Sequence, residues 1–111
     1  MGKIISYVAM PHPPIIIPEV GRGEEKKIKN TYDACDRVGT EIAKAKPDTI
    51  IVVTPHGTMF SDAISLSVES HISGSLNQFR APEVSMNFAI DLELTQRIID
   101  KADEEDIPQL R

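Results

Sequence analysis

Two histidines stand in similar local sequences and are the residues of this chain best suited to chemistry. His12 lies in the sequence MPHPP and His56 in the sequence TPHG, so each directly follows a proline. Each also follows a short apolar run that is typical of a buried strand. Neutral imidazole is a common metal ligand, and proline restricts the backbone just before each ring. The pair therefore favours one metal site over two histidines that end strands and bond to nearby loops.

The identity of the metal depends on a third ligand, which the sequence does not single out. A carboxylate beside two imidazoles is typical of non-haem Fe(II), whereas a third histidine or a cysteine suits zinc. Carboxylates occur in predicted loops at Glu19, Asp62 and Glu83, and their spacing distinguishes none of them. Cys35 falls on the apolar face of a predicted helix, where packing is the expected role. His71 is expected to be a solvated loop residue, with an acid or base beside the metal as the alternative.

A polar loop predicted at residues 71–82 carries one aromatic and one cationic residue. The loop is long for a connection between two strands, and such loops are often lids or binding loops. Arg80 is suited to pair with a substrate carboxylate, and Phe79 is suited to cover a pocket. The alternative places Phe79 beneath the sheet and Arg80 in solvent. Phe79 and Arg80 are therefore candidate substrate-binding residues, and no catalytic residue is assigned.

A βαβ unit is predicted to position the two histidines. Apolar, β-branched runs at 3–10 and 49–54 indicate strands buried on both faces, as in parallel sheets. Between them, residues 24–46 place apolar side chains every three or four positions, which predicts one amphipathic helix. A right-handed crossover makes the two strands parallel, and open α/β sheets bind ligands at the carboxyl ends of such strands. We therefore expect His12 and His56 to converge on one ion.

The second half of the chain is predicted to extend this sheet. Alternating apolar residues indicate half-exposed strands at 63–70 and 84–88. Asp91 is a suitable N-cap for a helix that ends near residue 105, and residues 107–111 stand where an α/β protein begins its next strand. The predicted fold class is α/β, with a mixed sheet built on the βαβ unit and helices packed on it. Residues 1–111 are interpreted as a single partial domain, the first half of a larger α/β domain.

Composition and charge exclude several classes of protein. The 111 residues include 41% hydrophobic and 26% charged residues, as in globular domains. A net charge of -5 argues against nucleic acid and anionic membranes as partners. No stretch approaches the ~20 apolar residues of a membrane span. One cysteine allows no internal disulfide, and the N-terminal segment lacks a signal-peptide cleavage site, so a cytoplasmic location is expected.

The proline-flanked His12, the sequence TPHG at His56 and residues 74–84 resemble class III extradiol ring-cleaving dioxygenases. More narrowly, the chain is similar to the dioxygenase-like part of AmmeMemoRadiSam system proteins, whose relatives include the Memo family. The likeness covers essentially the whole chain, but only the N-terminal portion of a family domain about twice as long. It implies that His12 and His56 are two of three Fe(II) ligands. It also implies that a glutamate ligand and a catalytic histidine lie beyond position 111.

The resemblance implies ring cleavage of a catechol-like aromatic substrate by a full-length member, with Fe(II) as the metal and zinc as the alternative. A chain that lacks the carboxylate ligand is expected to hold iron weakly and to be inactive alone. The alternative is a Memo-like module that binds a metal or a partner without catalysis. A zinc hydrolase ranks behind both, because its base and third ligand are missing.

The number of predicted helices indicates self-association. A parallel sheet needs both faces covered, and the helices predicted at 24–46 and 91–105 are too few to cover both. Apolar surface left in water favours association. We therefore expect a homo-oligomer whose contact contains apolar sheet or helix surface and an open strand edge.

Overall fold

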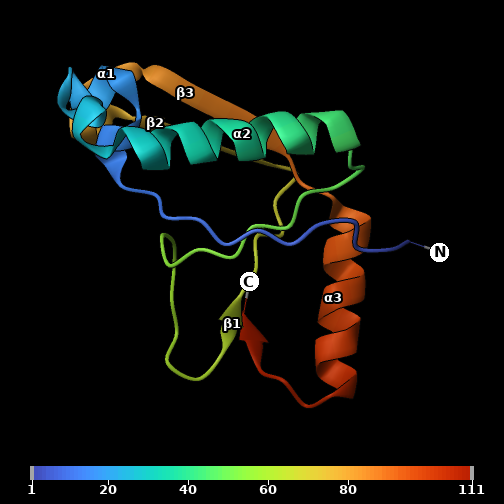
Figure 1. Ribbon diagram of the computed structural model, residues 1–111. Helices are drawn as coiled ribbons and strands as arrows, with labels where there is room; N and C mark the ends of the chain where they lie inside the picture. Colours follow the sequence, from blue (N-terminus) through green and yellow to red (C-terminus); the bar gives the residue numbers. More distant parts are fainter. Residues whose placement is uncertain (1, 111) are drawn as a thin grey trace. The chain divides into compact units, whose positions relative to one another are not determined.

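The computed structural model describes residues 2–110, which belong to two units (Figure 1). Unit 1 comprises Met1–Ile50 and Ser75–Ser85, and unit 2 comprises Ile51–Gly74 and Met86–Arg111. Helices and two small sheets give a mixed α/β structure, which confirms the predicted fold class. The assignment of residues 1–111 to a single partial domain stays a prediction.

Unit 1 is mainly helical. Its elements before residue 50 are η1 (Pro14–Ile16), α1 (Pro18–Gly21), η2 (Glu24–Ile28) and α2 (Lys29–Ala45). The helix predicted over 24–46 is confirmed as α2, but its first turn is the separate 3₁₀ helix η2. Two left-handed residues, Arg22 and Gly23, precede η2 and turn the chain between α1 and η2. At the other end, α2 stops at a left-handed Lys46, directly before a proline that disfavours helical backbone.

A hairpin occupies the region that was predicted as a loop. It consists of β2 (His71–Leu76), the 3₁₀ turn η3 (Asn77–Phe79) and β3 (Ala81–Ala89). The strand predicted at 84–88 is confirmed and is longer than expected, but the loop predicted at 71–82 is wrong. Because its serines and glycine favour turns, the sequence of β2 reads as a loop, whereas pairing with β3 keeps it extended. A connection this short allows only antiparallel strands.

Unit 2 contains one parallel pair of strands and one long helix. β1 (Ile64–Ser65) pairs with β4 (Gln109–Leu110), and α3 (Leu92–Glu104) precedes β4 in the chain. The predicted N-cap of α3 is confirmed, because Oδ1 of Asp91 accepts a hydrogen bond from the N–H of Leu94 at 3.0 Å. The strand predicted at 63–70 is present only as the shorter strand β1. The strand expected after α3 is confirmed as β4, and Arg111 lies outside the described residues.

The two strands predicted to flank α2 are wrong. Within residues 2–110, no strand is assigned at 3–10 or 49–54, so the predicted βαβ unit is present only as its helix. A strand needs a hydrogen-bonded neighbour, and residues 50–53 make no backbone hydrogen bond to other described residues. The apolar run instead lies in solvent, with Val53 95% exposed. A run of apolar residues thus indicates that a segment prefers to be buried. It does not indicate which neighbouring strand would bury it.

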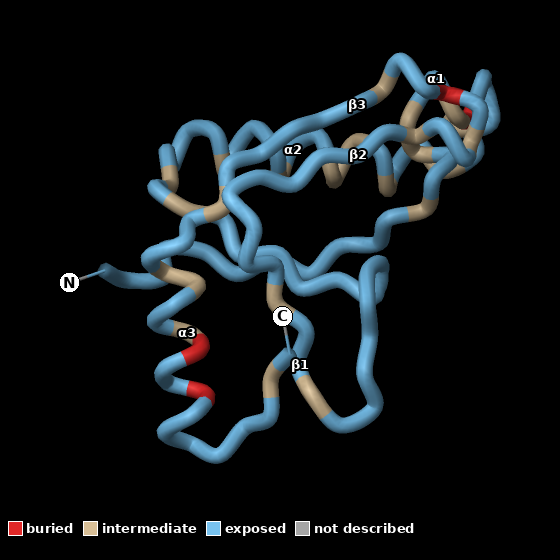
Figure 2. The backbone as a smooth tube through the Cα atoms, turned by 180° about the vertical axis from the view of Figure 1, so that it is seen from behind, coloured by how far each residue is buried: buried red, intermediate tan, exposed pale blue. Residues whose placement is uncertain are grey.

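The core of each unit is small (Figure 2). Among the described residues, the buried hydrophobic side chains are Ala81 in unit 1 and Ile99 and Ala102 in unit 2. Gly21 at the end of α1 is also buried. Within residues 2–110, no helix combines the length and apolar character needed to cross a bilayer.

Gly21→Ala is expected to destabilise unit 1 by about 1–3 kcal/mol, the usual cost of forcing an extra methyl group into a packed site. A Cβ atom at Gly21 would overlap the carbonyl oxygen of Ile15 and Oε2 of Glu25. The glutamate side chain can move, but the Ile15 carbonyl belongs to the backbone. The measurement is the free energy of unfolding in urea.

Gly39→Ala is the matched control for this prediction. Gly39 lies inside α2, and a Cβ atom there meets nothing within 4 Å. Alanine is the better helix former, so this variant is expected to gain about 0.5–1 kcal/mol. Equal stability of the two variants would show that the backbone at Gly21 is not closely packed.

Candidate functional site

His12 lies in unit 1, directly before the first turn of structure. The N–H of Ile16 donates to the carbonyl oxygen of Pro13 at 3.0 Å, so the chain turns into η1 immediately after the histidine. Proline at the first position of a 3₁₀ or α-helix loses no hydrogen bond, which explains why η1 can begin at Pro14. His12 is exposed.

His56 lies in unit 2, in a bend that a neighbouring hydroxyl stabilises. The N–H of His56 donates to Oγ1 of Thr54 at 3.2 Å, across the intervening Pro55. Threonine side chains commonly form such local bonds in turns. His56 is exposed, like every residue from 50 to 62. The bond to Thr54 therefore stabilises the bend at His56.

The candidate third ligands are dispersed. Glu19 lies in α1 and Glu83 in β3, so the loop predicted for each is wrong, whereas Asp62 lies in an irregular segment. All three carboxylates are exposed, and Cys35 is half-buried on α2. Within residues 2–110, no three histidine, cysteine, aspartate or glutamate side chains gather closely enough to hold a metal ion.

An Fe(II) site of the expected kind needs two imidazoles and one carboxylate. His12 and His56 are of the residue type that the two imidazole positions require, and within residues 2–110 no group of three possible ligands is formed. These residues therefore fit two of three ligand positions, and His12 and His56 as metal ligands stay a prediction.

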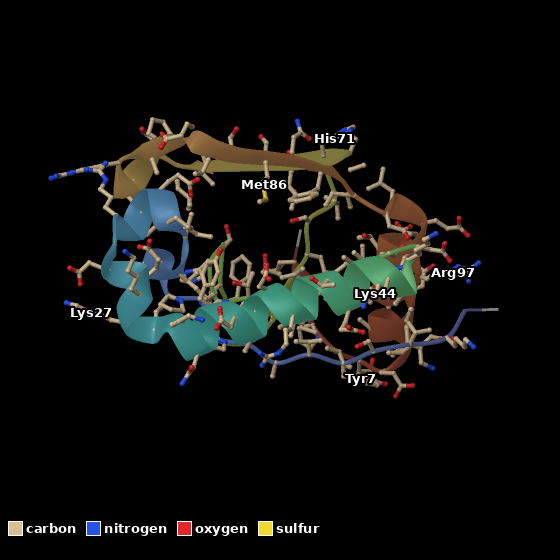
Figure 3. All side chains as sticks on the ribbon, turned by 45° about the horizontal axis from the view of Figure 1, so that its top comes forward. Tyr7, Lys27, Lys44, His71, Met86 and Arg97 are labelled. Carbon is tan, nitrogen blue, oxygen red and sulfur yellow. The ribbon has the colours of Figure 1, made fainter. Side chains whose placement is uncertain are left out.

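His71 is exposed at the start of β2 (Figure 3). Its Nδ1 atom lies 3.2 Å from Oγ of Ser70, the preceding residue in the chain. This environment agrees with the solvated histidine expected from the sequence, although the residue begins a strand rather than lying in a loop.

Phe79 and Arg80 form the turn of the hairpin. Phe79 is half-buried and Arg80 is exposed, with a left-handed backbone at φ 62°. The N–H of Arg80 donates to the carbonyl oxygen of Asn77 at 2.9 Å. The carbonyl oxygen of Arg80 accepts a hydrogen bond from Nη2 of Arg22 at 3.2 Å. Arg22 thus anchors the turn, a role that sequence analysis missed because the two arginines are 58 positions apart.

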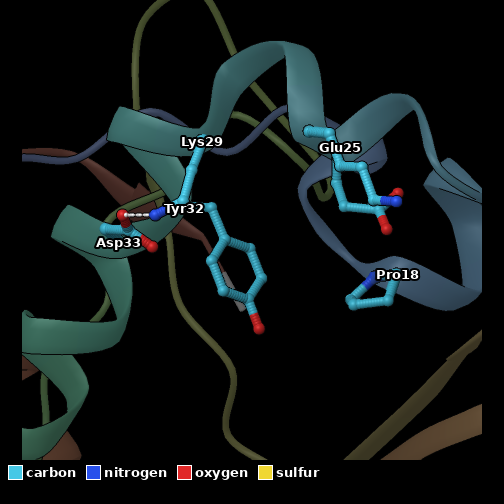
Figure 4. Close-up of a pocket in the computed structure, with 6 residues that line it drawn as sticks. Pro18, Glu25, Lys29, Tyr32 and Asp33 are labelled. Atoms are coloured by element: carbon cyan, nitrogen blue, oxygen red, sulfur yellow. Dashed lines mark hydrogen bonds and ion pairs between the residues drawn. The ribbon is translucent and has the colours of Figure 1, made fainter.

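A hollow of about 270 Å³ was also missed from the sequence (Figure 4). It lies in unit 1, where η2 leads into α2. Its lining residues are Pro18, Glu25, Lys26, Lys29, Tyr32 and Asp33. The Lys29 Nζ and Asp33 Oδ2 atoms are 2.5 Å apart, so two of its charges neutralise each other. Its lining includes neither a histidine nor the predicted substrate-binding residues.

Comparison with known proteins gives one family and one curated relative. Residues 6–110 match the family described as the catalytic LigB subunit of aromatic ring-opening dioxygenase. Protein CA_C1420 of Clostridium acetobutylicum is 54% identical over 104 residues, which make up 94% of this chain and 22% of that protein. The chain therefore spans about a fifth of the length of this relative. No solved structure matches the chain significantly.

Proposed function

The chain belongs to the family of the catalytic LigB subunit of aromatic ring-opening dioxygenases, and we propose that it is the N-terminal part of a non-haem Fe(II) extradiol dioxygenase. The family match over residues 6–110 is the observation that carries this proposal. The proposed substrate is a small, catechol-like aromatic compound. Its ring is opened by the complete polypeptide, with O₂ as the second substrate.

In this proposal His12 and His56 are two neutral imidazole ligands of the iron. The exposure of both histidines supports this role. The local hydrogen bonds that hold the backbone beside each histidine support it too. Ferrous iron held by two imidazoles and a carboxylate keeps open positions for substrate and oxygen. The carboxylate ligand and the catalytic acid or base come from outside the described residues. We therefore expect the chain alone to bind iron weakly and to be inactive.

We assign Phe79 and Arg80 to substrate binding. The exposed Arg80 guanidinium is suited to a substrate carboxylate, because its planar fork matches two oxygen atoms. The bond from Arg22 holds the Arg80 backbone in place, which lowers the entropy lost when the side chain binds. The half-buried Phe79 offers an aromatic surface next to that cation.

Within the family, we propose the AmmeMemoRadiSam and Memo-like branch, on the residues around His12 and His56. A cytoplasmic location is part of the proposal, since one half-buried cysteine suits a reducing compartment. A second candidate function is a Memo-like module that binds a metal or a partner without catalysis, with zinc as the alternative metal. The observation that favours it is the incomplete donor set within residues 2–110.

The test uses Protein CA_C1420, because it contains a region 54% identical to this chain within a longer polypeptide. The protein is loaded with Fe(II) without oxygen, mixed with a panel of catechols with and without a carboxylate, and then exposed to air. We expect a coloured ring-opened product. Tight iron binding without any product would overturn ring cleavage and favour the binding module. Absence of iron affinity would overturn the metal assignment as well.

A further inference from the structure

Two arginines that lie far apart in the sequence meet in unit 1. Nη2 of Arg22 donates a hydrogen bond to the carbonyl oxygen of Arg80 at 3.2 Å. Arg22 directly follows α1 and Arg80 directly precedes β3, and Figure 1 shows α1 beside the start of β3. Both arginines are exposed. The side chain of Arg80 starts from the residue whose carbonyl oxygen Arg22 binds, so the two guanidinium groups can reach a single ligand.

Buried residues hold the backbone on both sides of this contact. Gly21, which precedes Arg22, is buried, and Ala81, which follows Arg80, is 0% exposed. The N–H of Arg22 also donates to the carbonyl oxygen of Pro18 at 2.8 Å. Two long, exposed side chains therefore start from a backbone that packing and hydrogen bonds hold in place. Such support lowers the entropy that binding a ligand costs.

Both arginines have a backbone conformation that glycine adopts with less strain. Their φ angles are 49° and 62°, in the left-handed region. Residues with a Cβ atom are uncommon there, and such strained residues cluster at sites that clamp ligands. Arg22 stands directly after a helix, where glycine is the usual left-handed residue. The chain thus carries a guanidinium group at two positions where the backbone favours glycine.

Neither guanidinium is neutralised by a carboxylate of the described chain. The ion pairs within residues 2–110 join residues three or four positions apart, and none includes Arg22 or Arg80. The Oε2 atom of Glu25 lies beside this turn, where it accepts a hydrogen bond from the N–H of Gly23 at 2.8 Å. Arginine has five N–H donors, and Arg22 uses one of them for Arg80. Two such cations in a chain of net charge -5 form a local site for an anion.

We propose that Arg22 binds the substrate carboxylate together with Arg80. The identity of this anion rests on the function proposed above, which assigns Arg80 alone to it. A carboxylate accepts about four hydrogen bonds through its two oxygen atoms, so it can bind two guanidinium groups at once. Arg22 then has two roles. One N–H holds the Arg80 backbone, and the remaining donors contact the substrate.

The alternative is that Arg22 only anchors the turn. An anchor would act through the Arg80 side chain, so removing Arg22 would cost no further affinity once that side chain is absent. A guanidinium that contacts the anion itself contributes affinity in either background. Comparison of the single and double variants therefore separates the two roles.

Arg80→Gly and Arg22→Ala are the variants for this comparison. The hydrogen bonds of the Arg80 backbone to Arg22 and Asn77 do not need the side chain at position 80. Glycine adopts the left-handed backbone without strain, so Arg80→Gly should keep or raise the urea midpoint. Arg37→Ala is the matched control. Arg37 is an exposed arginine on α2, and within residues 2–110 it forms no ion pair.

The measurement is calorimetric titration of the complete polypeptide proposed above, without iron, with benzoate as the probe. Benzamide has a similar shape but no charge, so we expect it to bind about tenfold or more weakly than benzoate. Arg22→Ala and Arg80→Gly should each weaken benzoate binding by about tenfold, the usual cost of losing a hydrogen bond to a charged group. Arg37→Ala removes the same charge and should change the affinity by less than about twofold.

In the Arg80→Gly background, Arg22→Ala is expected to weaken benzoate binding by a further threefold or more, roughly half of its effect alone on a logarithmic scale. No further loss would overturn the proposal and leave Arg22 as an anchor of the turn. Equal binding of benzamide and benzoate would overturn the anion site. Tighter binding of inorganic phosphate than of benzoate would overturn the carboxylate as its ligand.

Turnover gives a second readout on the same variants. With Fe(II) bound, Arg22→Ala should lower kcat/KM for a carboxylated catechol about tenfold relative to catechol itself, because only the first carries the anion. An unchanged preference would overturn the role of Arg22 and leave the proposed ring cleavage intact. Benzoate binding that follows the expected pattern, in a polypeptide that opens no ring, would overturn the ring cleavage and leave the arginine site intact.

Discussion

His12→Ala and His56→Ala are each expected to weaken binding of Fe(II) by about tenfold or more, since even loss of a residue that merely supports a metal ligand costs about 10–100-fold. If both imidazoles bind one ion, a single imidazole left behind holds it poorly. Each single variant should then lose nearly as much affinity as the double variant, because the two ligands act as a unit. The measurement is an anaerobic titration of the complete polypeptide proposed above, carrying each replacement, with Co(II) as a coloured substitute for iron.

His71→Ala is the matched control for this prediction. His71 is exposed like the two predicted ligands, and its Nδ1 atom already lies near Oγ of Ser70. Its loss should leave the affinity unchanged. Loss of affinity in His71→Ala alone would contradict the assignment. Additive losses in the double variant would indicate two independent sites rather than one shared ion.

The helices could be predicted from the sequence because their signals are local. The apolar repeat every three or four residues that identifies α2 and α3 is contained within each helix. The cap of α3 is also local, since Asp91 and Leu94 are three positions apart. Neither feature requires knowledge of the rest of the chain.

The strands were predicted less well because each depends on a distant partner. β1 pairs with β4, whose sequence is more than forty positions away. The run at 50–53 has a stronger strand pattern than β1, yet no described residue pairs with its backbone. β2 shows the opposite error, since pairing with β3 makes a strand of a polar sequence that resembles a loop.

In the candidate site, too, local features could be predicted from the sequence and contacts between distant residues could not. The sequence identifies His12 and His56, because the proline before each ring and the apolar run before each proline are local features. It places Arg80 in a long loop, whereas the structure places this residue, exposed, at the turn of a hairpin. The bond from Arg22 to the Arg80 carbonyl oxygen joins residues 58 positions apart, so no local pattern reveals it.

Ile99→Ala is expected to destabilise unit 2 by about 2–5 kcal/mol, the range measured when a buried isoleucine is cut back to alanine. Ile99 is 2% exposed, and the other buried hydrophobic residue of the described part of unit 2 is Ala102. The replacement therefore removes most of the large apolar side chain that this unit buries (Figure 2). The measurement is the urea midpoint followed by circular dichroism.

Leu92→Ala on the same helix is the control that separates burial from helix formation. Leu92 is 46% exposed, so its truncation should cost no more than about 1 kcal/mol. Alanine has a higher helix propensity than isoleucine. The change in helix propensity in Ile99→Ala therefore opposes the expected loss of stability. Both variants must be compared at one protein concentration, since self-association raises the apparent stability. Equal losses in the two variants would show that α3 is held by its own helical bonds and that Ile99 contributes no packing.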